Sequence, residues 1–349
     1  MFHHQRTGMN ATAAPSPSPS RRRRNPISLT VAIVIALLIV WVLFTMWWWD
    51  KEPEQFDPVA VTTAHMKEIG RPMATGAVTT YTLIESVQTL LDKHGGYLSN
   101  DKLPPGVFMD NIPNWEFGSL VASRDLAQAL RNSFSRSQTQ STEDKDLGEA
   151  DPLLNSPNDR WLLPSSESQY GKATDDLEKY LVRLSDSEDA NAHFYARADN
   201  LADYLQTVSA RLGSLSQRLS ASVGQLKVDA APNADVAGKA GQSKAVYVKT
   251  PWNKIDDNFY EARGYTWALL EQLKAIRHDF APILRSKNAD ASLQQVIREL
   301  EESQKSLGSP VVLNGSPFGF FANHSLVMAN YISRANAAII DLRTLLGRG

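Results

Sequence analysis

The most constraining feature of the sequence is an uncharged stretch of 23 residues, ISLTVAIVIALLIVWVLFTMWWW, at positions 27–49. As a helix rising 1.5 Å per residue, it would extend roughly 34 Å, slightly more than the ~30 Å hydrocarbon layer of a bilayer. A buried core helix rarely runs so far without a polar face. A cleavable signal peptide has an apolar core of about 7–15 residues and a small-residue cleavage site, which WWWDKEPE does not offer. The stretch therefore predicts a retained transmembrane helix.

The charges that flank this stretch predict its orientation. Arginines at Arg21, Arg22, Arg23 and Arg24 precede it, whereas Asp50, Glu52 and Glu54 follow it. The positive-inside rule places the N-terminus in the cytoplasm and residues 50–349 on the far side, which in a Gram-negative bacterium is the periplasm. Trp47, Trp48 and Trp49 fit the aromatic belt at the outer interface. We expect these four arginines and three tryptophans to contact the bilayer.

The charge of the remaining chain argues against a nucleic-acid partner. The whole chain has 36 basic and 38 acidic residues, and five of the basic ones precede position 50. Positions 50–349 therefore carry 31 basic and 38 acidic residues, a net charge of −7. Binding to DNA or RNA depends on neutralising phosphates, for which an acidic body is poorly suited. The absence of cysteine also excludes disulfides, thiolate metal sites and a cysteine nucleophile.

Beyond the tryptophans, apolar spacing predicts an all-α body. Residues 1–26 contain alternating Pro and Ser and indicate a disordered tail, and residues 50–78 indicate a linker. A helical bundle domain is expected over 79–349, with loops at 103–118 and 138–164 where prolines interrupt the pattern. The expected helices cover about 79–94, 119–137, 166–184, 194–219, 250–280, 290–307 and 323–346.

Three of these helices carry heptad-like seams, in which apolar residues recur in alternating steps of four and three. The seam over 194–219 has small residues on one flank, Ala202, Ser209 and Ser216, and arginines on the other. A small flank lets a third helix approach, whereas a two-stranded coil usually carries charges on both flanks. We therefore favour an elongated intramolecular bundle over a parallel homodimer, and a homo-oligomer stays open.

Several strings resemble an uncharacterised bacterial family known as domain of unknown function 2333. They are GYLSNDKLPPGVFMDNIPNWEFGSL, FYARADNLADYL, ARLGSLSQRLSASVGQ, KTPWNKIDDNFYEARGYTWALL and ANHSLVMANYISRANAAIIDLR. The resemblance covers most of residues 50–349. It implies an inner-membrane protein of Gram-negative bacteria with one span near the N-terminus. It brings no catalytic residues, because the family has no established activity.

No motif in the sequence assembles a catalytic, metal or cofactor site. The seven histidines show no HExxH or similar ligand spacing, there is no GxSxG elbow, and GKAGQSK lacks the spacing of a phosphate loop. Acidic clusters occur at 143–146, 256–257 and 299–302, but paired carboxylates act only when a cleft places them across a bond. Arg197 and Arg263 each follow an aromatic pair, and surface snorkelling is the favoured interpretation of both. We predict no cofactor.

Two loops combine proline, glycine and aromatic residues outside the seams, LPPGVFMDNIPNWEFG and NGSPFGFFANHS. One interpretation is that they plug the ends of the bundle. The other is an exposed aromatic surface that receives a partner. The candidate partner surface consists of Phe108, Trp115, Phe117, Phe318, Phe320 and Phe321.

Together these patterns predict a membrane-anchored envelope protein with a helical periplasmic domain. We expect an interaction or scaffolding role, with an envelope protein as a partner, rather than catalysis. Two alternatives stay open: an envelope enzyme acting on peptidoglycan, and a helical sensor domain that binds a small ligand.

Overall fold

The computed structural model describes residues 26–137, 142–186, 191–228 and 245–348. The chain divides into two compact units, Met1–Phe44 and Thr45–Gly349, and we refer to the second as the body. Arg21–Arg24, the predicted tail and most of the 229–245 stretch lie outside the described residues.

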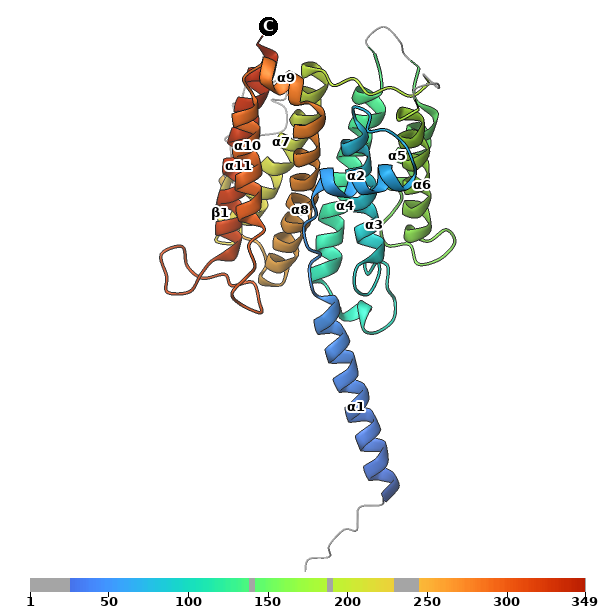
Figure 1. Cartoon of the computed structure of the whole chain (residues 1–349). Coiled ribbons are helices and arrows are strands. Elements are labelled where there is room, and N and C mark those ends of the chain that lie inside the picture. Colours follow the sequence, from blue (N-terminus) through green and yellow to red (C-terminus); the bar gives the residue numbers. More distant parts are fainter. Residues whose placement is uncertain (1–25, 138–141, 187–190, 229–244, 349) are drawn as a thin grey trace, which may run out of the picture. The chain divides into compact units, whose positions relative to one another are not determined.

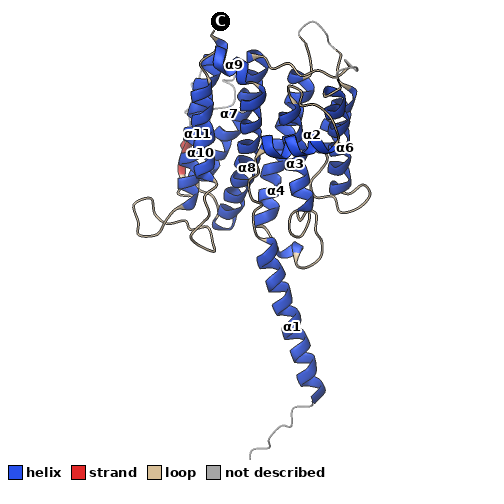
Figure 2. Ribbon diagram, in the orientation of Figure 1, coloured by secondary structure: helices blue, strands red, loops and turns tan. Residues whose placement is uncertain are grey.

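The described chain is mostly helical (Figures 1 and 2). Its α-helices are α1 (Pro26–Trp49), α2 (Pro58–Glu68), α3 (Ala77–Asp92), α4 (Asn111–Ala129), α5 (Lys145–Leu154), α6 (Ser166–Leu184), α7 (Ala198–Ser220), α8 (Ile255–Asp279), α9 (Ala281–Ser286), α10 (Asp290–Ser303) and α11 (His324–Gly347). Short 3₁₀ turns lie at Gly106–Phe108 and Trp252–Lys254, and a π-helical turn, Leu130–Phe134, extends α4. One antiparallel pair, β1 (Gln225–Val228) with β2 (Ala245–Val248), forms the one sheet among the described residues, and an isolated β-bridge joins Asn314 to Asn323.

Helix α1 is apolar along its length and its side chains are largely exposed. Within it, Leu29–Trp49 is long and apolar enough to cross a membrane, and it is the one such helix among the described residues. A retained anchor and a signal sequence share this property. The predicted apolar helix is therefore confirmed, whereas its orientation stays a prediction.

Helix α8 forms the centre of the body. It packs most extensively against α4 and also against α3 and α10. On one side α10 and α7 pack against α11, and on the other α6 packs against α3 and α5 (Figure 1). Two glycines bring α4 and α8 together, because a Cβ on Gly264 would lie 1.8 Å from the carbonyl oxygen of Trp115 and one on Gly118 would lie 2.0 Å from that of Glu261. Any side chain at either position would separate the two helices.

The seam of α7 is buried within the chain. Leu205, Val208 and Leu212 are fully inaccessible to solvent. The small flank faces α11, where Ser209 Oγ lies 2.7 Å from Asn336 Oδ1 and Ser216 Oγ lies 2.6 Å from Ser333 Oγ. The approach of a helix to this flank is as predicted, and coiled-coil supertwist stays a prediction.

Three predicted boundaries are wrong for identifiable reasons. The 50–78 linker contains α2, whose N-terminus is capped by Asp57 and whose Thr62 and Met66 are buried. The loop expected over 103–118 ends early, because α4 begins at Asn111 and accommodates Pro113 in its first turn, where a backbone N–H has no helical partner. The loop expected over 138–164 contains α5, which Asp144 caps despite an internal proline.

Two starting points also differ. The helix expected from Thr250–Pro251 begins with a 3₁₀ turn, and α8 itself starts at Ile255. The seam expected from Phe194 lies in α7 only from Ala198 onward.

Candidate functional site at the junction end of the body

The residues that connect α1 to the body are held by side-chain contacts. Trp48 packs edge-on against His94, with ring centroids 5.5 Å apart. Gly95 has φ +86°, and a Cβ at this position would approach Trp49 Cδ2 to 2.6 Å, so this turn must be glycine to receive the indole. Lys51 Nζ lies 4.5 Å from the centroid of the Trp47 ring. The chain therefore enters the body without a free linker.

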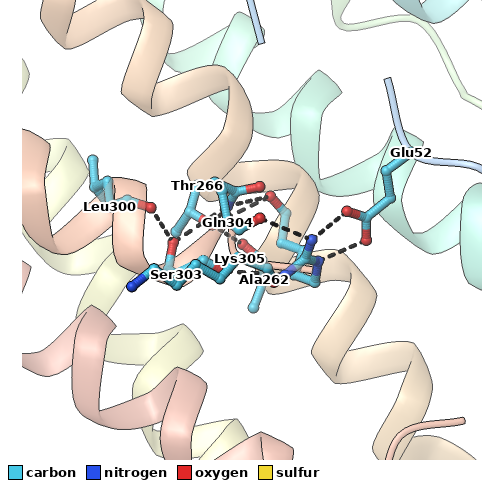
Figure 3. A network of polar contacts seen from close by, with 8 residues as sticks. Glu52, Ala262, Thr266, Leu300, Ser303, Gln304 and Lys305 are labelled. Atoms are coloured by element: carbon cyan, nitrogen blue, oxygen red, sulfur yellow. Dashed lines mark hydrogen bonds and ion pairs between the residues drawn. The ribbon is translucent and has the colours of Figure 1, made fainter. Parts of the chain in front are cut away.

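Glu52 completes this attachment through Arg263 on α8. Arg263 Nε donates to Glu52 Oε1 at 2.6 Å and its Nη2 donates to Oε2, which makes the pair bidentate (Figure 3). The Arg263 side chain is 6% exposed and that of Glu52 is 21% exposed. Partial burial strengthens such a charge-assisted pair relative to an exposed one. The snorkelling predicted for Arg263 is wrong.

The same guanidinium group caps the C-terminus of α10. Arg263 Nη1 donates to the carbonyl oxygens of Ser303 at 3.1 Å and Lys305 at 3.0 Å, and Nη2 donates to that of Gln304 at 3.4 Å. The last carbonyls of a helix have no partners within it, and a cation there opposes the negative end of the helix dipole. Gln304 Nε2 adds a bond to Thr266 Oγ1 at 2.7 Å (Figure 3). We call Glu52, Arg263 and the carbonyls of 303–305 the junction network.

Several turns lie at the same end of the body as this network. Asn111 Nδ2 reaches Asp50 Oδ2 at 3.4 Å, which places the start of α4 there. Asn314 Nδ2 donates to the Ser222 carbonyl at 3.3 Å, and the Thr250 N–H donates to Ala221 at 2.9 Å. We define the junction end as residues 45–52, 93–110, 155–165, 221–224, 247–254 and 304–327; the longer loops among these lie at the lower end of the body in Figure 1.

A cavity of about 230 Å³ lies beside the junction network. Its lining includes Phe259, Arg263, Lys305, His324, Met328 and Tyr331. Burial lowers the pKa of His324, and its Nδ1 accepts the N–H of Leu313 at 3.0 Å. The imidazole is thus a neutral structural acceptor near pH 7. The cavity can take a small ligand with both an apolar and a polar part, because apolar side chains share its lining with Lys305, whose ammonium lies 2.5 Å from Glu302 Oε2 and is largely exposed.

The aromatic loop, residues 306–323, is closed at its base. Asn323 caps α11 through Leu326 N–H at 2.9 Å, and its Nδ2 donates to Asn314 Oδ1 at 2.7 Å and to the Gly315 carbonyl at 2.8 Å. The carbonyl oxygen of Ser316 accepts a hydrogen bond from the Gly319 N–H at 2.8 Å in a turn. The loop therefore has a fixed base and an exposed tip.

The predicted partner-surface residues differ widely in exposure. Phe318, Phe320 and Phe321 are 103%, 98% and 69% exposed, and Phe108 is 64% exposed. Trp115 is fully buried, with its ring centroid 5.0 Å from that of Trp267, so assigning it to the surface is wrong. It lies in the first turns of α4 rather than in a loop.

Phe117 is half-buried and lines an open groove between α4, α7 and α8. Of the three predicted interface tryptophans, Trp47 and Trp48 are 62% and 45% exposed, while Trp49 is half-buried against the Gly95 turn.

The acidic clusters noted in the sequence are paired with basic side chains. Arg183 lies 2.7 Å from Asp144 and 2.6 Å from Asp146, Glu299 lies 2.6 Å from Arg334, and Asp257 lies 2.7 Å from Lys254. Among the described residues, no group of three or more His, Asp or Glu side chains is placed to hold a metal ion. These carboxylates have structural partners that account for them.

Sequence reasoning missed the junction network. The one signal available was an arginine inside an apolar helix pattern, since a buried guanidinium requires an anionic or carbonyl partner.

A comparison with family models places these features in context. The model of DUF2333, described as an uncharacterized protein conserved in bacteria, matches residues 22–349. The chain belongs to this family. DUF2333 membership covers both α1 and the whole body, so the apolar helix and the junction network lie within the region that the family shares. No curated protein and no solved structure matches the chain.

Proposed function

We propose that this protein is a single-span, membrane-anchored envelope protein of Gram-negative bacteria, whose helical body lies in the periplasm and serves an interaction or scaffolding role. The junction network is the observation that carries this proposal. Glu52 follows the last residue of the apolar helix by three positions and is already bound to Arg263. An anchored body attached without a free linker stays within a short distance of the bilayer.

The orientation rests on the flanking charges, with Arg21–Arg24 before α1 and an acidic body after it. A reporter enzyme that is active only in the periplasm, fused after Pro53, should be active in cells. The same reporter fused before Arg21 should be silent. A silent reporter after Pro53 would refute the orientation.

The interaction role is tested by crosslinking the full chain in intact cells. The same envelope protein should be recovered in independent experiments and lost when α1 is replaced by a cleaved signal peptide. Failure to recover any reproducible partner would count against scaffolding.

The cavity beside Arg263 favours a small-ligand sensor as a second candidate. Its lining shares Arg263 with the junction network, so a ligand there would contact a residue that also holds Glu52. Amphipathic anions should then raise the thermal midpoint of the wild type more than that of Lys305→Ala. Equal shifts in both proteins would argue against this site.

A peptidoglycan enzyme is supported less well. The acidic clusters are engaged by arginine and lysine side chains, whereas a glycosidase needs two carboxyl groups that face a substrate bond across a cleft. Release of fragments from purified sacculi by the body would establish the enzyme.

A further inference from the structure

The exposed large apolar side chains of the body are unevenly distributed. Outside residues 45–52, the junction end holds Leu103, Val107, Phe108, Trp161, Leu162, Leu163, Tyr247, Trp252, Val311, Phe318, Phe320, Phe321 and Val327. Elsewhere in the described body, only Val59, Met73 and Ile340 are exposed to a comparable degree. Scattered exposed apolar residues are ordinary, whereas a concentration at one end of a domain marks an interaction site.

The aromatic loop is the most pronounced member of this group. Its eighteen residues, SLGSPVVLNGSPFGFFAN, contain no Asp, Glu, Lys or Arg. The side chains of Phe318 and Phe320 are 103% and 98% exposed, and the Phe320 ring packs edge-on against that of Phe321, with centroids 5.6 Å apart. Moving a phenylalanine side chain from water into an apolar environment lowers the free energy. An uncharged loop can enter a bilayer interface without desolvating a charge.

Other loops of the junction end present the same kind of side chain. Trp252 is 86% exposed in the 3₁₀ turn before α8, and Leu163 is 95% exposed in the α5–α6 loop. Phe108 projects from the 3₁₀ turn before α4. These side chains come from separate loops rather than from the walls of one pocket, which suits a broad surface better than a peptide or a helix.

The membrane anchor indicates that the bilayer itself covers this surface. The apolar span ends at Trp49, and Trp47–Trp49 belong to the body and lie at its junction end. Because Glu52 is bound to Arg263, the chain between span and body has no slack. The junction end is therefore held near the headgroup layer, whatever angle α1 takes to the body.

We propose that the junction end docks on the bilayer that α1 spans, with the aromatic loop and Trp252 inserted at the headgroup level. The proposal rests on the proposed membrane anchor and names the lipid surface as the partner of the exposed aromatic side chains. Monotopic amphipathic elements insert about 5–10 Å in this way. The body then has a membrane-facing end and a remote end at α9, beyond the 25 residues of α8.

The absence of cysteine in the chain allows a direct test. Full-length single-cysteine proteins, Phe320→Cys, Leu38→Cys and Ser286→Cys, are labelled with a small fluorophore and reconstituted in phosphatidylethanolamine/phosphatidylglycerol vesicles. Lipids carrying a nitroxide quencher at a shallow or a deep acyl position are then added. Phe320 should be quenched most by the shallow lipid and Leu38 by the deep lipid, while Ser286 in α9 should keep its fluorescence.

The controls separate this proposal from the anchor itself. If Leu38 is quenched and Phe320 behaves like Ser286, the docking proposal is refuted while the anchor stands. If Leu38 is not quenched, the membrane anchor fails. A label at Ser316→Cys should lose its quenching when Phe318, Phe320 and Phe321 are all changed to Ser, because these side chains drive insertion. Unchanged quenching in that variant would overturn the role given to the phenylalanines.

Discussion

Glu271 provides the most quantitative prediction. This carboxyl group lies on α8, is fully inaccessible to solvent, and neither oxygen accepts a hydrogen bond from the described residues. Its pKa is raised from 4.5 to about 7, chiefly because burial disfavours the charged form. Lys274, whose Nζ lies 3.5 Å away, opposes this rise, and the charges of Asp57 and Glu301 add to it. We predict that Glu271→Gln stabilises the body at high pH and has little effect near pH 5.

The magnitude follows from the two pKa values. One pKa unit corresponds to about 1.4 kcal/mol, so ionising Glu271 in the folded protein costs about 3 kcal/mol more than in the unfolded chain. Because the folded pKa is the higher one, the carboxyl group's favourable contribution is complete below about pH 4.5 and is lost as the pH rises through about 7. Glutamine has a similar shape and does not ionise, so it avoids this loss.

Urea unfolding of residues 50–349, followed by far-ultraviolet circular dichroism, measures the effect. The free energy of unfolding of Glu271→Gln relative to the wild type should rise by about 2–3 kcal/mol between about pH 5 and pH 8. Lys274→Met should move the upper inflection of the stability curve, which reports the folded-state pKa of Glu271, to higher pH, since it removes the charge that lowers this pKa. A difference between Glu271→Gln and the wild type that does not change with pH would refute the reasoning.

Two further predictions concern the junction and the core. Glu52→Gln and Arg263→Gln should each lower the free energy of unfolding by about 2 kcal/mol or more, because each leaves a partly buried charge without its partner. A double-mutant cycle, measured on a fragment that begins at residue 45, should show a coupling energy of about 1–3 kcal/mol between the two positions. Additive effects of the two substitutions would exclude a direct pair. Gly264→Ala should lower the free energy of unfolding by about 1–3 kcal/mol, because the new Cβ would lie 1.8 Å from the Trp115 carbonyl oxygen. The control is Gly171→Ala in α6, where a Cβ would have no atom within 4 Å and the change should be neutral or stabilising. Equal effects of the two substitutions in urea titrations would contradict the close contact between α4 and α8.

Helices with long apolar seams were predictable because each turn repeats the same signal. In α7, for example, the apolar seam positions between Leu201 and Leu219 are all buried in the core. Helices α4 and α5 were harder, since Pro113 and Pro152 suggest loops by local rules. Pro113 lies in the first turn of α4, where its missing N–H costs no helical hydrogen bond. Helix α5 forms despite Pro152, with Asp144 as its N-cap.

The candidate site was less predictable than the helices. Trp115 and Phe318 lie in stretches of similar composition, yet one is buried against Trp267 and the other is fully exposed. Trp115 is buried because its stretch begins helix α4, whereas the stretch around Phe318 stays a loop. The few residues on either side do not determine which of the two stretches becomes helical. Glu52 and Arg263 are 211 residues apart, a separation at which no periodicity links two positions.

That separation also has a consequence for biogenesis. Glu52 leaves the ribosome 211 residues before Arg263, which at about 5–20 residues per second is roughly 10–40 s earlier. The α10 carbonyls that share the guanidinium group come about 40 residues later still. Glu52 therefore cannot bind Arg263 until most of the chain has been synthesised. A chain truncated before α8 would lack Arg263 and leave Glu52 without this partner, so closure of the junction reports that synthesis has reached the second half of the protein.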